Sequence, residues 1–179
     1  IVGFHYVSSL LLVCVSAAFL LRMNEPGGAR VLAVPRWYAG LAHLTTLVLA
    51  VSITFGVLTT GAGPHSGDAE SGRNGFDASL WEHIHAWPGY ALLALTVILV
   101  AIAAVSKLRT RGWGVALLLL QFVQVAVGLY QARNGLPPFA VGVHMVLAAL
   151  TAAAMTLFIL RMKRPVDAPA ELAAGAESR

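Results

Sequence analysis

Long runs of apolar residues dominate this chain, and short polar segments separate them. Five such runs recur along the sequence, at 2–21, 37–60, 84–105, 113–130 and 139–160. Each matches the roughly 20 residues that an α-helix needs to cross a bilayer. The apolar residues are continuous rather than alternating, and each run is too long for the strand of a transmembrane barrel. The pattern therefore predicts an all-α integral membrane protein with five transmembrane helices.

The first and the last of these runs share a motif. Val2-Gly3-Phe4-His5-Tyr6-Val7 is followed 139 residues later by Val141-Gly142-Val143-His144-Met145-Val146, and Leu21-Arg22-Met23 then aligns with Leu160-Arg161-Met162. We interpret this as an internal duplication. Since the run at 139–160 closes a unit of four helices, we expect segment 1–23 to be the last helix of an earlier, homologous four-helix unit whose other helices are not in this sequence.

The duplication and the polar segments divide the chain into four parts. Segment 24–36 is expected to be a cytoplasmic loop, and 37–164 a four-helix bundle. Segment 165–179 is rich in Ala, Glu and Ser and is predicted to be a disordered tail. Cys14 is the only cysteine in the chain, so an internal disulfide and a cysteine-based metal site within this chain are excluded.

Composition and charge support a membrane location. The chain is 58% hydrophobic and 11% charged, with a mean hydropathy of +0.77, which lies far from soluble proteins. A net charge of +4 could suggest nucleic acid, but the basic residues divide by side. Nine lie on one side of the predicted spans and two on the other: Arg22, Arg30, Arg36, Lys107, Arg109, Arg111, Arg161, Lys163 and Arg164 against Arg73 and Arg133. The positive-inside rule then predicts a cytoplasmic C-terminus, with no nucleic-acid partner.

Three histidines are the candidate chemistry of these helices. His5, His85 and His144 each lie within about two helical turns of the predicted outer membrane boundary, so they share one depth. Neutral imidazole is a good axial ligand for haem iron, and helix bundles build such sites from inward-facing side chains. His85 and His144 come from alternate helices of one four-helix unit and are expected to face each other. The alternative is histidines that hydrogen-bond to neighbouring helices.

Glu82 precedes His85 by three residues, which places both on one helix face. It is a candidate partner of the ligand or proton-handling group, or simply a glutamate favoured by the helix N-terminus. His83 is two residues from His85, about 200° around the helix, and is expected at the membrane interface. His43 lies near the cytoplasmic end and is interpreted as structural or interfacial.

The remaining polar residues have less specific interpretations. Gln121 and Gln124 lie inside the run at 113–130 and are expected to hydrogen-bond between helices. Arg73 and Arg133 are the two basic residues on the outer side, and they could neutralise the propionates of a haem, lipid headgroups or loop carboxylates. His65 lies in a loop rich in glycine and proline, which indicates a specific backbone shape.

Several motifs together resemble the bacterial haem A synthase family, over essentially the whole of 1–164. The segment Thr60-Gly61-Ala62-Gly63-Pro64-His65-Ser66-Gly67-Asp68 is similar to the Gly-Pro-His-x-Gly-Asp loop of that family. Further similarities are the Arg73…Asp77 element, Glu82-x-x-His85, Gln124-x-x-x-Gly128, Leu136-Pro137 and Val141-Gly142-x-His144. The loop motif with its downstream histidines is the most specific of these.

The resemblance implies an eight-helix protein of two homologous halves in a bacterial plasma membrane. Its reaction would oxidise a ring methyl of haem O to the formyl of haem A. His85 and His144 would be the axial ligands of a haem b cofactor, and His5 one ligand of the substrate haem. The catalytic glutamate of the family would belong to the half that is not in this sequence, with Glu82 as its counterpart. Haem O, the lipid bilayer, haem O synthase and cytochrome oxidase assembly are the implied partners.

Two other interpretations stay open from the sequence. A non-enzymatic bis-histidine membrane cytochrome that relays electrons would have the same helices and ligands. A transporter or scaffold with buried structural histidines would have the helices but no haem.

Overall fold

The computed structural model describes residues 2–62, 75 and 77–166 of the chain. Within them lie five long helices: α1 (Val2–Met23), α2 (Arg36–Ala62), α3 (Ala78–Val105), α4 (Arg111–Arg133) and α5 (Pro138–Arg161). Each is long and apolar enough to cross a membrane, so the predicted five-helix membrane architecture is confirmed. Arg73, His65 with its Gly-Pro-His loop, and the tail from residue 167 lie outside the described residues.

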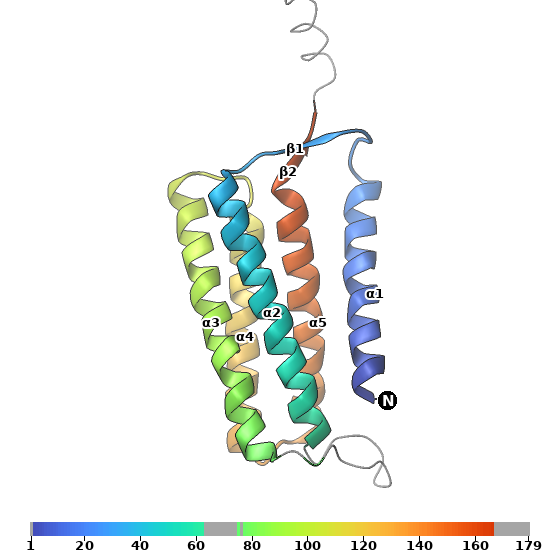
Figure 1. The fold of residues 1–179 in the computed structure, drawn as a ribbon, viewed down its shortest axis with the longest axis vertical. Helices are drawn as coiled ribbons and strands as arrows, with labels where there is room; N and C mark the ends of the chain where they lie inside the picture. Colours follow the sequence, from blue (N-terminus) through green and yellow to red (C-terminus); the bar gives the residue numbers. More distant parts are fainter. Residues whose placement is uncertain (1, 63–74, 76, 167–179) are drawn as a thin grey trace, which may run out of the picture.

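Helices α2 to α5 form a four-helix bundle, and α1 lies outside it (Figure 1). Each bundle helix packs against its neighbours in sequence, and α2 closes the ring against α5. The contacts are most extensive within the pairs α2–α3 and α4–α5. Helices α3 and α5 are therefore diagonal to each other. Helix α3 begins earlier than its apolar run, so Glu82, His83 and His85 all lie inside the helix.

Helix α1 packs in parallel beside α5, the helix whose sequence it repeats (Figure 1). The hydroxyl of Tyr6 donates to the backbone oxygen of Met145 at 3.0 Å, and these two residues are counterparts in the duplication. Equivalent positions of two repeated units contact each other where they lie beside the two-fold axis that relates the units. A Cβ added to Gly3 would come 2.8 Å from Val57 of α2, so this glycine allows close packing. The contact between equivalents is what two homologous halves would make at their interface.

A pair of short strands closes the end of the bundle that carries most of the basic residues. Strand β1 (Arg30–Leu32) pairs antiparallel with β2 (Lys163–Pro165). The backbone amide of Ala33 also donates to the oxygen of Met162 at 2.8 Å. The sequence analysis did not predict this pair, because segment 24–36 was expected to be a loop and the chain after residue 160 has no alternating pattern. The strands connect the α1–α2 segment to the end of α5.

The tightly packed core lies in the half of the bundle nearest the strands. Tyr38, Leu99, Leu117, Met155 and Phe158 are almost completely buried there. Among the described residues of the opposite half, the buried side chains are small, namely those of Ser52, Ala62 and Ala140. Fewer side chains are therefore buried in the half where α3 and α5 begin.

Candidate functional site

Two histidines from diagonally opposite helices meet in the half of the bundle where α3 and α5 begin. His85 on α3 and His144 on α5 are both partly buried. The centroids of their imidazole rings lie 6.2 Å apart, and the two ring planes cross at 84°. The facing arrangement that the sequence suggested for these two residues is thus present, and it brings two metal-ligating side chains together in an apolar bundle.

A glycine of the adjacent helix supports each of the two rings. A Cβ atom added to Gly56 of α2 would lie 3.0 Å from Cε1 of His85. One added to Gly128 of α4 would lie 3.1 Å from Cε1 of His144. Both distances are shorter than ordinary van der Waals contact, so the missing side chain of glycine is what lets each ring come this close. Each helix pair, α2–α3 and α4–α5, therefore presents one histidine in the same way.

The contact of His85 with α2 fixes which ring nitrogen carries a proton. Its Nδ1 lies 3.0 Å from the backbone oxygen of Ser52, one turn before Gly56. Because a carbonyl oxygen can only accept, this hydrogen bond requires the proton on Nδ1. Nε2 then keeps its lone pair and is the nitrogen available to a metal. Metal-bound histidines in proteins are commonly oriented by such a hydrogen bond on the other nitrogen.

His144 has related but less complete contacts. The residue one turn before Gly128 is Gln124, the counterpart of Ser52 on α2. The buried Nδ1 of His144 nevertheless has no well-formed hydrogen bond to any described residue. The Gln124 side chain donates instead from Nε2 to the backbone oxygen of His144 at 3.1 Å. The backbone of His144 is therefore held more firmly than its ring.

The centroid separation of the two rings equals the span of two imidazoles that bind one metal. Two imidazoles bound through Nε2 to one metal, with bonds of about 2 Å, have ring centres roughly 6 Å apart. The 6.2 Å separation of His85 and His144 matches this value. Within the described residues, no three His, Cys, Asp or Glu side chains gather as a site for a bare metal ion. The donor set thus suits a group that brings its own equatorial ligands.

His5 does not join this pair. It lies on α1, outside the bundle, and its side chain is exposed. The adjacent Tyr6 is the residue that faces α5. Helix α1 also exposes several large apolar side chains, namely Phe4, Leu11, Leu12, Val15 and Phe19. His5 is therefore directed away from His85 and His144.

The other outer-side candidates lie at the same end of the bundle as the histidine pair. Glu82 is exposed one turn before His85, and His83 is exposed as well. Arg133 is exposed at the end of α4, which lies at the same end of the bundle. His83 was expected to point away from the helix face that carries His85, and its exposed side chain agrees with this.

His43 lies far from the pair along α2. It is separated from Gly56 by 13 residues, or about 20 Å of helix, and it lines a crevice at the strand end of the bundle instead. Gln121 and Gln124 both bond between helices, as predicted. Gln121 donates from Nε2 to Oγ1 of Thr96 on α3 at 2.9 Å.

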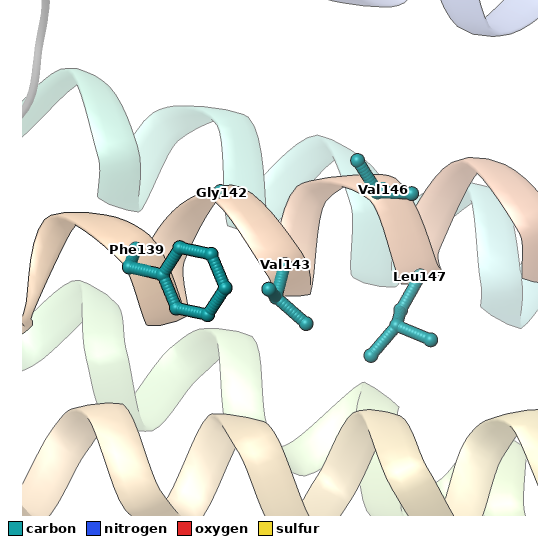
Figure 2. Close-up of a pocket in the computed structure, with 5 residues that line it drawn as sticks. All are labelled: Phe139, Gly142, Val143, Val146 and Leu147. Atoms are coloured by element: carbon teal, nitrogen blue, oxygen red, sulfur yellow. The ribbon is translucent and has the colours of Figure 1, made fainter.

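An apolar groove of about 450 Å³ lies on α5. Figure 2 shows the residues that line it, which are Phe139, Gly142, Val143, Val146 and Leu147. All of these lie on one helical face, and Phe139 is 84% exposed. At 100° per residue, the centre of that face lies more than a quarter turn from His144. The groove is therefore an outer face of the bundle and not the place where the rings meet.

Sequence reasoning did not single out Ser52 and Gly56, which position His85. A signal for them exists in the sequence. Ser52-x-x-x-Gly56 on α2 repeats the spacing of Gln124-x-x-x-Gly128 on α4, with a polar residue one turn before a glycine in each case. Comparison with known proteins adds no relative, since no family model, no curated protein and no solved structure matches this chain.

Proposed function

We propose that this chain forms the haem b half of a haem A synthase, the enzyme that oxidises a ring methyl of haem O to the formyl of haem A. The observation that carries the proposal is the pair His85 and His144, whose ring centroids are 6.2 Å apart inside a membrane helix bundle. The Gly-Pro-His-x-Gly-Asp loop supports the family, and the contact between the counterparts Tyr6 and Met145 supports its duplicated architecture.

The two histidines would hold the cofactor, His85 through Nε2, and the rest of the bundle orients them. Ser52 fixes the proton of His85 on Nδ1, and Gly56 and Gly128 allow both rings to approach. When bound, the haem supplies a one-electron couple at iron. The apolar helices exclude water around the rings, and such burial is one of the factors that set a haem potential.

The substrate side of the proposed enzyme lies beyond α1. His5 supplies one ligand to the substrate haem, and the second ligand belongs to helices outside this sequence. The exposure of His5 supports this assignment. Glu82 is assigned to proton handling beside His85, and Arg73 and Arg133 to the haem propionates. Exposed positions at the outer end of the bundle suit Glu82 and Arg133 to these tasks.

The same proposal places the chain in a bacterial plasma membrane with its C-terminus in the cytoplasm. Haem O is the substrate, and haem O synthase and the cytochrome oxidase assembly machinery are the partners. The basic residues around β1 and β2 support this orientation by the positive-inside rule. Reporter fusions at the C-terminus and within residues 63–74 should report opposite sides, with the C-terminal fusion cytoplasmic. The reverse result would overturn the orientation.

A pyridine haemochrome spectrum of the purified protein tests the proposal. We expect haem b, in a ratio approaching one per chain. A folded protein with no haem would refute every haem-based assignment and would favour a scaffold with structural histidines.

One alternative has an observation in its favour. Because two histidines would occupy both axial positions of the iron, this site suits a cytochrome that only relays electrons. Turnover of haem O by the intact protein separates the two functions. Conversion to haem A supports the synthase, whereas bound haem b with no conversion supports the cytochrome.

A further inference from the structure

A partly buried cluster of charges joins α1, β1 and α5 at the strand end of the bundle. Glu25, whose side chain is 11% exposed, lies at its centre. Three arginines surround this carboxylate: Arg22 at 2.7 Å, Arg30 at 2.9 Å and Arg161 at 3.2 Å. Burial alone would raise the pKa of Glu25, but the hydrogen bond from Arg22 and the charges of all three arginines outweigh it and lower the pKa. The carboxylate is thus held ionised.

This cluster has more positive charge and more donors than its glutamate can satisfy. Three guanidinium groups share one carboxylate. Nη1 of Arg30 is close to Glu25 but lacks the alignment of a hydrogen bond, and the buried Nε of Arg161 has no acceptor among the described residues. Unsatisfied donors of buried cations are costly. The cluster therefore keeps an excess of positive charge that its glutamate does not balance.

A crevice of about 140 Å³ opens beside the cluster, between α1, α2, α5 and the strands. Its polar lining comes from Arg22, His43 and Lys163. The rest of the lining is apolar, from Leu32, Ile159, Leu160 and Met162. Arg22 belongs to both the cluster and the crevice, so the excess positive charge extends into the crevice. Cationic and apolar walls side by side fit an amphipathic anion.

We propose that this crevice binds the phosphate headgroup of an anionic phospholipid. Basic pockets between transmembrane helices, at the end where basic residues gather, are suited to acidic headgroups. The helices that border the crevice present exposed apolar side chains at the same end, including Leu20 of α1 and Leu44 of α2. These surfaces accommodate acyl chains next to the headgroup. A free phosphate ion would use only the cationic part of the site.

Native mass spectrometry of the detergent-purified chain tests this assignment. The chain is titrated in parallel with dioleoylphosphatidylglycerol and dioleoylphosphatidylcholine, and the bound lipids are counted. We expect preferential retention of one phosphatidylglycerol. Lys163→Gln, at an exposed position of β2, should weaken that binding about fivefold, the effect of one basic residue near an anionic headgroup. His43→Glu should abolish the preference, because it introduces a negative charge without touching Glu25.

Arg109→Gln is the matched control. Arg109 is exposed in the α3–α4 connection at the same end of the bundle, but it does not line the crevice. This variant should retain the phosphatidylglycerol. Equal weakening by Arg109→Gln and Lys163→Gln would show general charge attraction and overturn the site, as would equal binding of both lipids. Competition by inorganic phosphate at the concentration of the lipid would assign the crevice to a free anion and overturn the lipid. None of these readouts depends on haem.

Discussion

The ring centroids of His85 and His144 lie 6.2 Å apart, although α3 and α5 are diagonal members of the bundle. Each ring reaches the centre over a glycine of a different helix, so the encounter depends on all four helices. The two residues are 59 positions apart in the sequence. The pair can be disrupted in two ways, by removing one ring or by displacing it. The two kinds of substitution are expected to have different effects.

Removing either ligand should eliminate the low-spin haem spectrum. His85→Ala and His144→Ala each leave one axial position without a protein nitrogen, so the bis-histidine absorption and electron paramagnetic resonance signals should disappear. His83→Ala is the matched control, because His83 is exposed two residues from His85, and it should keep the spectrum. Persistence of the low-spin spectrum in both ligand variants would show that other residues bind the iron.

Displacing a ring should weaken haem binding without removing a ligand. In Gly56→Ala and Gly128→Ala, the new methyl group meets Cε1 of the ring at 3.0 Å and 3.1 Å, so the histidine must move by a few tenths of an ångström. Loss of an orienting contact typically costs about tenfold or more in affinity. Haem dissociation to apomyoglobin measures the change.

Two other helical glycines provide controls for this prediction. Gly40 lies on α2 with Gly56, and Gly142 lies on α5 with His144, and a Cβ at either meets no atom within 4 Å. Gly40→Ala and Gly142→Ala should release haem at the wild-type rate. If all four variants behaved alike, helix stiffness and not ring support would be the cause.

The helices and the histidine pair could be predicted from the sequence for different reasons. Apolar runs report directly on transmembrane helices, so their number and order were correct. The depth of His85 and His144 follows from helix position, because rise per residue is fixed. Their approach through Gly56 and Ser52 could not be predicted, since the sequence does not state which faces of α2 and α3 pack together.

The structure around β1 and β2 was not predicted, because it depends on contacts between segments far apart in the sequence. Segment 24–36 has neither apolar periodicity nor alternation, and β1 exists only because β2 pairs with it. Glu25 likewise has no local signal. Its partner Arg161 is brought close by the packing of α1 beside α5. The basic residues as a group predicted the orientation of the chain in the membrane. The partner of each single basic residue could be identified only from the folded structure.

Neutralising Glu25 should destabilise the fold in a pH-dependent way. Glu25→Gln leaves three arginines without their carboxylate, and because solvent screens these partly exposed side chains we expect a loss of about 1 kcal/mol at neutral pH. Because the pKa of Glu25 is lowered in the fold from its ordinary value of 4.5, its contribution is fully present above that value. It is lost as the pH falls through the lower pKa of the folded state.

Thermal unfolding in detergent, measured between pH 7 and pH 3, checks this prediction. The difference between the wild type and Glu25→Gln should shrink below the ordinary pKa of 4.5. Glu82→Gln is the comparison, because Glu82 is exposed and its replacement should change stability by less than about 0.5 kcal/mol. A difference that is constant with pH would exclude the carboxylate as its source.

Gln124 should affect haem retention through the backbone of His144, and Gln121 provides a close comparison. Both are glutamines of α4 with one bond to another helix, from Nε2 of Gln124 to the oxygen of His144 and from Nε2 of Gln121 to Thr96. Both also have a buried Oε1 without a partner among the described residues.

Each change to Leu removes one interhelical bond, worth about 0.6 kcal/mol on average, so stability should fall by similar amounts. Only Gln124→Leu releases the backbone of a ligand, and it should accelerate haem loss about tenfold, measured by transfer to apomyoglobin. Equal acceleration in both variants would mean that bundle stability alone controls retention.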